Sequence, residues 1–428
     1  MATQKPSIPK KILLLTNIDR GEANVFLATS HALLQADPDV KLHFATFGGF
    51  EASVISVWRH ARRTLPYAKP ITFHEIEGLP MAEALRQYFS RKEIPWRNNY
   101  LPESFLAPPG LSNTPRAIRD TAPIFIPYSG PQLVDIFFSI VEIINKVAAD
   151  LVVVDSLMTP ALTACYHLGV KFTCLSPNAI KEFAASTQPL GAGLWKYPAT
   201  LPELDFQAIL PPHVFPCGPI IRSAPPISDT EPGLERWLAR GPTVYINLGS
   251  ICLVTEDQAS ELAMAVKTVI DTVKKQSDAP QLQVLWKLKK CGEYRVLEAG
   301  SRIYEILGKE IQADLVRIVD WILAEPIALL QTGHIDLSAG VRQVVLPQWT
   351  DCYDYAQRVE MLGIGRWGSR TTKPQWSAQE LARELLDVLL GERSDAMKQK
   401  ARELAELCQK SGSGAVTAAR ILLAECQE

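Results

Sequence analysis

The segment KILLLTNIDRGEANVFLATSHALLQADPDVKLHFAT, residues 11–46, decides the fold class. An apolar run ends in a polar turn after Thr16, a helical stretch covers about residues 24–35, and a second apolar run covers residues 41–46. Such an alternation of strand, helix and strand is typical of a parallel sheet with helices on its faces. The segment therefore predicts an α/β domain at the start of the chain.

The same alternation continues along the chain. Apolar side chains recur on one helical face of residues 131–149, which predicts an amphipathic helix, and residues 151–154 and 171–175 are predicted strands. Residues 58–130 are rich in proline, arginine and aromatic residues, and we expect helices and long loops over a pocket there. Further strands are predicted at residues 243–248, 282–286, 315–319 and 343–346, with helices between and after them.

A proline-rich segment at residues 211–233 interrupts this alternation. Repeated prolines disfavour helices and central strands, so the segment predicts a linker between two domains. Two α/β domains would place a ligand between them, at the carboxyl ends of the strands. The predicted division is an N-terminal domain at residues 1–218, a linker at 219–235, a C-terminal domain at 236–405, and a final helical segment at 406–428.

Composition excludes several classes of protein. With 428 residues, 47% apolar and 21% charged, the chain can bury a sizeable core. A net charge of -2 argues against binding nucleic acid through general charge. No apolar run reaches the roughly 18 residues of a membrane span, and the N-terminal run is too short for a signal peptide. The eight cysteines form no CxxC pair, so we expect a cytoplasmic protein with free thiols and no bound metal.

Three segments of the second half carry candidate binding residues at strand ends. Gly249 follows a strand and Ser250 follows Gly249, at a point where backbone N–H groups at a helix start favour phosphate. Taken alone, an ordinary strand-to-helix turn is the simpler explanation. Trp321 could stack on a planar base, but taken alone it is better explained as a packing residue. Asp351 could accept hydrogen bonds from sugar hydroxyls, or could instead cap a helix.

Two acidic residues of the first half are candidates for acid–base chemistry. Glu22 follows the first strand and Asp155 ends a later one. Two carboxyl groups in one cleft can have separated pKa values and divide the work of acid and base. Surface caps are the simpler explanation for both when nothing else is considered. His31, His74 and His334 are isolated in the sequence, and a lone histidine is more often structural than catalytic.

Taken together, these features resemble the UDP-glycosyltransferase family, with its two-domain GT-B fold, and most closely its fungal small-molecule branch. The resemblance covers nearly the whole chain and is strongest after residue 210. The motifs that carry it are Phe215–Pro219, Val244–Ser250, Val319–Trp321, Leu330–Asp336, Ala339–Pro347, Asp351–Ala356 and Gly414–Val416.

The resemblance implies a function and a set of roles. It implies an inverting, metal-independent transfer of a sugar, glucose by preference, from a UDP-sugar to a small hydrophobic hydroxylated acceptor such as a secondary metabolite. It implies no cofactor, and it implies that the final helix, within residues 406–428, packs back on the N-terminal domain. Charge and hydropathy add the expectation of no nucleic acid and no membrane span. Ser250 would contact the donor diphosphate, Trp321 the uracil and Asp351 the sugar. The implied donor-binding residues are Gly249, Ser250, Trp321, His334, Asp351 and Cys352, the implied acceptor-binding residues are Phe26, His74 and Phe137, and the implied catalytic pair is Glu22 and Asp155.

The chain departs from the family pattern at three places. Glu22 occupies the position of the usual catalytic histidine, and Asp155 matches its carboxylate partner. Cys352 replaces the amide of the family's Asp-Gln pair. After Asp336 the chain continues directly with Leu337, where the family has a strand, a phosphate-binding turn and a helix, roughly 17 residues on average element lengths.

The apparent deletion leaves the function open between two classes. One is an active glycosyltransferase, and the other is an impaired or non-catalytic relative that binds an acceptor or a partner protein. A splice or gene-model variant, a degenerate enzyme and an engineered deletion would each explain the gap. The flanking residues keep the family pattern, which fits a clean excision better than gradual drift. Another α/β sugar-nucleotide enzyme, such as an epimerase, fits residues 347–356 less well.

Overall fold

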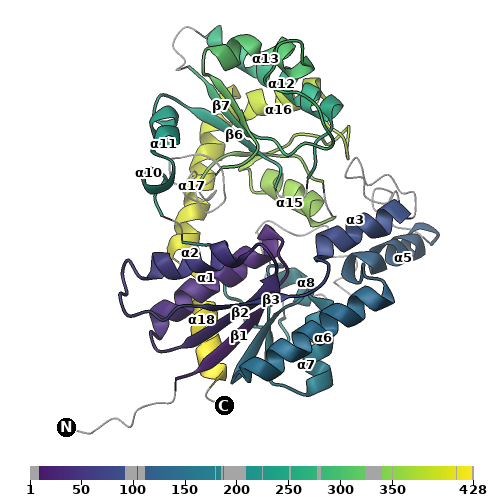
Figure 1. Ribbon diagram of the computed structural model, residues 1–428. Coiled ribbons are helices and arrows are strands. Elements are labelled where there is room, and N and C mark those ends of the chain that lie inside the picture. The colour runs from purple at the N-terminus through teal and green to yellow at the C-terminus, as the bar shows by residue number, and fades with distance from the viewer. Residues whose placement is uncertain are drawn as a thin grey trace.

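The computed structural model shows two lobes, each built on parallel strands (Figure 1). The N-terminal lobe carries the first five strands, and the C-terminal lobe carries the other five. The structure describes residues 9–91, 104, 111–178, 180–184, 187, 209–223, 225–249, 252–276, 281–322, 340–348, 350–410 and 412–426.

The N-terminal lobe has one five-stranded sheet whose strands are all parallel. The strands occur in the order β3-β2-β1-β4-β5. Strand β1 therefore lies in the centre, and its carboxyl end adjoins those of β2 and β4. The strands are β1 (Lys11–Leu15), β2 (Lys41–Phe47), β3 (Thr72–Ile76), β4 (Leu151–Asp155) and β5 (Phe172–Leu175).

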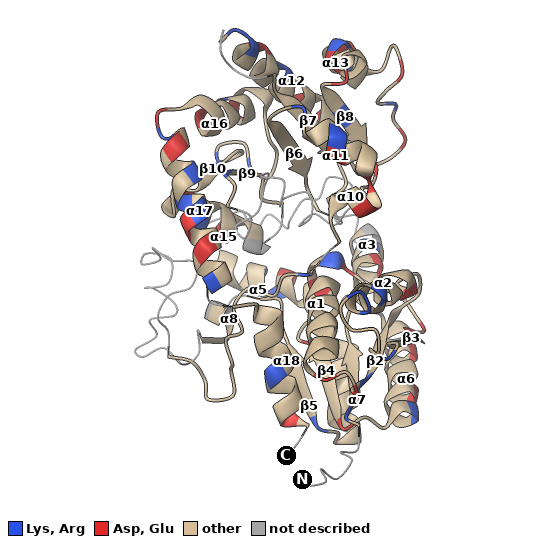
Figure 2. Ribbon diagram, turned by 90° about the vertical axis from the view of Figure 1, so that its left-hand side faces the viewer, with Lys and Arg blue, Asp and Glu red and all other residues tan. Residues whose placement is uncertain are grey.

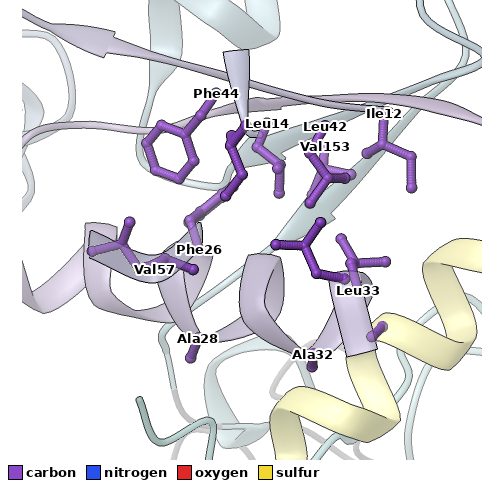
Figure 3. Packing of buried hydrophobic residues seen from close by; sticks show 14 of the residues in the cluster. Ile12, Leu14, Phe26, Ala28, Ala32, Leu33, Leu42, Phe44, Val57 and Val153 are labelled. Carbon is purple, nitrogen blue, oxygen red and sulfur yellow. The ribbon is translucent and has the colours of Figure 1, made fainter. Parts of the chain in front are cut away.

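Helices cover both faces of this sheet, which explains why β1 is apolar from Ile12 to Leu15. Helices α1 (Arg20–Ala36), α2 (Glu51–Ala61) and α18 (Gly414–Glu425) cover one face, and α6 (Gly130–Val147) and α7 (Thr159–Leu168) cover the other. Side chains alternate along a strand, so Leu14 faces α1 and Leu15 faces α6. Figure 3 shows the first of these two cores, in which Phe26 of α1 packs beneath the sheet.

Strand β3 lies in the region where the sequence predicted only helices and loops. It is an edge strand, and only Ile76 among its residues is buried. A half-exposed edge strand lacks the continuous apolar run that marks a buried strand, so the pattern gave no signal. The other helices of this lobe are α3 (Met81–Arg91), α5 (Asn113–Phe125) and α8 (Ile180–Ala184).

The C-terminal lobe contains two separate parallel sheets. Three strands form the sheet β6-β7-β8, and two form the sheet β10-β9. The strands are β6 (Thr243–Asn247), β7 (Gln283–Lys287), β8 (Val316–Val319), β9 (Gln343–Val345) and β10 (Gly365–Trp367). The helices are α12 (Glu256–Lys274), α13 (Arg302–Gln312), α15 (Thr350–Met361) and α16 (Ala378–Leu390).

The two C-terminal sheets share one core although no hydrogen-bonded ladder joins them in the described part of the chain. Val344 and Leu346, from the segment of β9, pack against the same cluster as Val284 and Trp286 of β7. Each sheet therefore has an edge strand, β6 or β9, that is paired on one side only among the described residues. A further strand between β6 and β9 would join them into one parallel sheet.

The proline-rich segment is partly helical, contrary to the expectation that its prolines would exclude helices. It forms α10 (Ile227–Thr230) and α11 (Pro232–Leu238). Pro232 is in the first turn, where a missing N–H costs no hydrogen bond. Trp237 is buried, and its Nε1–H donates to the carbonyl oxygen of Asp314 at 2.8 Å. This part of the segment thus belongs to the C-terminal lobe.

The chain ends by returning to the N-terminal lobe. Helix α17 (Ser394–Lys410) leads to α18, which lies beside the first sheet in both views (Figures 1 and 2). Ala415, Ala418 and Leu422 of α18 pack in the core with α1. No single helix in the described ranges is long and apolar enough to cross a membrane; α5 and α6 meet the criteria only as a pair bent by 46°.

Candidate active site

Two buried carboxyl groups meet at the carboxyl edge of the N-terminal sheet. Asp155 is the last residue of β4, and Glu22 lies in the first turn of α1, directly after β1. Asp155 is fully buried, and Glu22 is 9% exposed. The Thr16 hydroxyl donates to Asp155 Oδ2 at 3.0 Å, and the Leu157 N–H donates to Oδ1 at 2.9 Å. A further hydrogen bond joins the carboxyl groups of Glu22 and Asp155.

Burial raises the pKa values of both carboxyl groups. For Glu22 the main cause is desolvation, followed by the charge of Asp155 and the hydrogen bond to it. For Asp155 desolvation is partly offset by hydrogen bonds from Leu157, Glu22, Thr16 and Asn17. These bonds favour the ionised form of Asp155 and the protonated form of Glu22. A proton held by this pair therefore resides mainly on Glu22.

Further polar groups surround this pair, and the sequence analysis did not single them out. Burial raises the pKa of Asp19, with the charges of Arg86 and Lys289 opposing it. The pKa of Tyr128 is also raised, first by burial and then by the charges of Asp19 and Glu22. Asn17 Oδ1, Asp19 Oδ2 and Glu22 Oε2 are buried atoms without a hydrogen-bond partner among the described residues. Buried polar atoms normally have a hydrogen-bond partner. These three oxygens have none among the described residues, so they are candidates to bind a ligand.

An aromatic side chain of the C-terminal lobe lies against the first residue of α1. Trp321 follows β8 and is 53% exposed. The Lys287 Nζ lies 4.5 Å from its ring centroid, and the Arg20 Cζ lies 5.7 Å from it. Desolvation lowers the pKa of Lys287, and the nearby charges of Lys289 and Arg20 lower it further. Arg20 and Glu22 belong to the same helical turn, so Trp321 is brought close to the carboxyl pair.

Only part of the predicted donor site lies in the described residues. Gly249 has φ +84°, which favours glycine, and its N–H donates to Asn247 Oδ1 at 3.0 Å. Cys352 is half-buried on α15. Asp351 lies at the start of α15, but its side chain is outside the described set, as are Ser250 and His334. The predicted roles of these residues in donor binding stay predictions.

The structure corrects the predicted acceptor role of Phe26. Its side chain is fully buried with Leu14, Phe44 and Val57 (Figure 3). Phe26 follows Glu22 by one helical turn and shares its face. However, α1 starts at the edge of the sheet, and one turn later it lies over the sheet. The same helical face therefore meets the edge of the sheet at Glu22 and the core at Phe26.

His74 and Phe137 are also packing residues by their contacts. His74 precedes the end of β3 by two residues, and its Nε2 lies 2.9 Å from His43 Nδ1 on the neighbouring strand. Phe137 makes an edge-to-face contact with His167 of α7, with centroids 5.4 Å apart. Both side chains are engaged on the sheet face covered by α6 and α7, so neither prediction of acceptor contact is supported.

The described residues contain no group of three or more His, Cys, Asp and Glu side chains placed to hold a metal ion. None of the eight cysteines is in a disulfide.

Comparisons with known proteins show which proteins this chain is similar to. No protein-family model matches the chain. Glycosyltransferase sdnJ of Sordaria araneosa is 27% identical over 529 aligned positions, which cover 100% of this chain and 99% of that protein. A solved UDP-glucosyltransferase from Polygonum tinctorium, capable of glucosylating indoxyl, has a TM-score of 0.62 at 14% identity, covering 99% of this chain and 100% of that one. A protein from O. sativa, solved in complex with a trichothecene, has a TM-score of 0.61 at 14% identity, covering 97% and 100%.

The chain therefore has the GT-B fold, as the sequence predicted. Within that class it is related over its full length to a fungal glycosyltransferase, which confirms the resemblance drawn from the motifs. The aligned length of 529 positions exceeds the 428 residues of this chain, so part of the relative has no counterpart here.

The raised pKa of Glu22 predicts a pH-dependent effect of Glu22→Gln on stability. Below the ordinary pKa of a glutamate, about 4.3, both the folded and unfolded chains hold the proton. Above it, only the folded chain does, so wild-type stability falls as the pH rises toward the folded pKa. Glutamine does not titrate, so Glu22→Gln lacks this loss of stability. We therefore expect the melting temperature of Glu22→Gln relative to that of the wild type to be higher at about pH 8 than at about pH 5.

Thermal unfolding of both proteins across this pH range measures the difference. Glu142→Gln is the matched control, because Glu142 is an exposed residue of α6. A difference for Glu22→Gln that does not change with pH would contradict the assignment of a retained proton to Glu22.

Proposed function

We propose that this chain is an inverting UDP-sugar-dependent glycosyltransferase that transfers a hexosyl group, glucosyl by preference, to a hydroxyl of a small hydrophobic acceptor. The observation that carries the proposal is that a carboxyl pair and an aromatic side chain both lie near the start of α1. The buried pair of Glu22 and Asp155 lies within one helical turn of Arg20, which contacts Trp321 of the other lobe. A proton acceptor and an exposed aromatic ring are thereby brought together from two lobes.

The proposed chemistry assigns proton removal to the carboxyl pair. When the shared proton resides on Asp155, Glu22 is ionised, and its unpartnered Oε2 can accept the proton of an acceptor hydroxyl. The acceptor oxygen then forms a bond to the anomeric carbon from the side opposite UDP. The bond from that carbon to the phosphate oxygen breaks, and UDP leaves with the electron pair. Because burial raises the pKa of Glu22, its ionised form is a stronger base than an ordinary carboxylate and suits this step better.

The proposed donor contacts use the cationic and aromatic groups beside this pair. Trp321 presents a half-exposed ring that can stack on uracil, and stacking of a base on an aromatic ring contributes about 1–3 kcal/mol. Lys287 and Arg20 flank that ring and provide positive charge near a diphosphate. Such charges stabilise a leaving diphosphate in a site that excludes water.

Trp321→Ala is expected to weaken UDP binding about tenfold, because the stacking surface is lost. Isothermal titration of the purified chain with UDP, with a melting curve alongside, measures this effect. Tyr166→Ala is the control, since Tyr166 is an exposed aromatic residue of α7. Equal UDP affinity of the wild type and Trp321→Ala would contradict the assigned role of Trp321.

The activity itself is tested by UDP release from UDP-glucose in the presence of a panel of hydroxylated aromatic compounds. Saturable UDP binding with turnover supports the proposal. Binding without turnover on any acceptor, across several UDP-sugars, would contradict it.

The C-terminal lobe favours a second candidate function. In it, the chain is a relative of the glycosyltransferases that is impaired in donor binding. Strands β6 and β9 lack a common neighbour in the described part of the chain, although their sheets share a core. The sequence places the apparent deletion between β8 and β9, and the relative's greater aligned length agrees with a loss of residues. An impaired chain would show no UDP binding, and it would melt broadly or at low temperature.

A further inference from the structure

A cavity of about 250 Å³ lies between α1, α2 and the segment at residues 222–230, which leads into α10. In both overall views α10 lies between the lobes, on the side of α2 (Figures 1 and 2). The carboxyl pair, by contrast, involves the first turn of α1 and the end of β4. The lining residues are Leu27, His31, Ser56, Val57, Arg59, His60, Arg63, Arg222, Ser223, Pro225 and Thr230.

Specific polar contacts hold the two sides of this cavity together. Arg222 Nη2 donates to the Ser56 hydroxyl at 2.9 Å, and His60 Nε2 lies 3.0 Å from the Ser223 hydroxyl. Arg63 forms an ion pair with Asp229 at 2.7 Å. Two contacts thus fix the segment before α10 against α2, and a third fixes α10 itself, so the cavity has a defined wall on each side.

The charged side chains that line the cavity are all arginines. Three arginines and two histidines line it, and no acidic residue does within the described ranges. Asp229 lies nearby but is paired with Arg63, whereas Arg59 has no carboxylate partner in the part of the chain that the structure describes. An excess of guanidinium groups around a partly desolvated cavity attracts an anion.

Two imidazole groups in the cavity have unused hydrogen-bonding capacity. The rings of His31 and His60 stack with centroids 5.0 Å apart. His31 is 9% exposed and has no hydrogen bond to another described residue, and His60 Nδ1 is buried without a partner there. Burial, His60 and Arg222 lower the pKa of His31 to about 4, and burial lowers the pKa of His60. A buried nitrogen without a partner, such as His60 Nδ1, is costly, and a bound oxyanion would give it one.

We propose that this cavity is a binding site for a phosphate dianion, either free or as the terminal group of a small phosphomonoester. Donors converge on the cavity from α1, α2 and the segment before α10, which suits a tetrahedral oxyanion better than a planar carboxylate. A cavity of about 250 Å³ exceeds the roughly 30 Å³ that a water molecule occupies in the liquid. The apolar side chains of Leu27, Val57 and Pro225 leave room for the carbon part of a small ester.

The proposal is tested by calorimetric titration of the full chain with inorganic phosphate, without UDP and with sodium chloride matching the ionic strength. We expect a saturable heat and a melting temperature that rises with phosphate as the site fills. Arg59→Gln and His31→Gln should each weaken binding about tenfold, the usual range for a hydrogen bond to a charged group. Arg420→Gln, an exposed residue of α18, is the matched control and should bind as the wild type does.

A spectroscopic measurement covers the case in which a variant folds poorly. In the wild type, bound phosphate should raise the pKa values of His31 and His60, which is visible in the imidazole proton signals. A parallel titration with glycerol 3-phosphate separates the two sources, since tighter binding than phosphate identifies a phosphomonoester and weaker binding identifies free phosphate.

The absence of a saturable heat together with unchanged histidine signals would overturn the proposal. A rise in melting temperature that does not saturate and is equal in all variants would do so as well, because it would be a general salt effect. Neither result depends on whether the chain binds UDP or transfers sugar.

Discussion

Glu22→Gln is expected to lower kcat about 10²- to 10⁴-fold, the contribution of a positioned general base. Glutamine keeps the shape of the side chain and can still hydrogen bond to Asp155, but it cannot accept a proton from an acceptor hydroxyl. UDP affinity should stay close to that of the wild type, because the proposed donor contacts come from Trp321, Lys287 and Arg20. The measurement is UDP release under saturating donor and acceptor, with UDP affinity measured separately.

Two further variants make this result specific to proton transfer. Glu142→Gln changes an exposed glutamate of α6 and should leave kcat unchanged. Glu22→His places a different proton acceptor at the same position, and partial recovery of activity with an altered pH profile would support a base at residue 22. Wild-type kcat in Glu22→Gln would show that the acceptor proton leaves by another route.

Restoring the apparently missing unit is expected to strengthen donor binding and stabilise the C-terminal lobe. The change is an insertion, between the sequence positions of Asp336 and Leu337, of the corresponding segment of the Sordaria araneosa relative. These positions lie outside the described residues. A central strand would satisfy the open edges of β6 and β9 and bury apolar side chains, each contributing about 1.5–3 kcal/mol before chain entropy is subtracted. The N-terminus of an added helix would also favour the diphosphate.

We expect the insertion to tighten UDP binding by at least about tenfold and to raise and sharpen the melting transition. Calorimetric titration with UDP and a melting curve measure both effects. A glycine–serine segment of equal length, inserted at the same place, is the control, because it lengthens the chain without forming a strand. Equal effects of the two insertions would contradict the idea that β6 and β9 lack a shared neighbour.

The sequence predicted the catalytic candidates but not their electrostatics. Glu22 and Asp155 were identified at the ends of predicted strands, and the structure brings their carboxyl groups into one hydrogen bond. Their raised pKa values come mainly from burial, which depends on how α1 and α6 cover the sheet. Asp19 and Tyr128 were missed because an acidic residue in a turn and a tyrosine in a loop carry no periodic pattern. The one signal available for Asp19 is that it lies in the same turn as Glu22.

The predicted acceptor residues show that helical faces and loop assignments do not predict which side chains are packed in the core. Phe26 shares a face with Glu22, yet it is buried under β1 and β2 because α1 lies over the sheet by its second turn. His74 was placed in a region without predicted strands, whereas β3 holds it against His43 of β2. Pairing between strands far apart in sequence decides such contacts, and no local pattern contains that information.

By itself the sequence determined the class of fold, because alternating apolar runs and amphipathic helices leave few alternatives to parallel sheets covered on both faces. It also indicated Glu22 as a candidate base and showed the departure from the family pattern before β9. Only the tertiary structure decided which charges face one another. The carboxyl pair of Glu22 and Asp155, the contact of Arg20 with Trp321, and the arginine-lined cavity between α2 and α10 each join distant segments. Their energies depend on distance and desolvation, which exist only once the chain has folded.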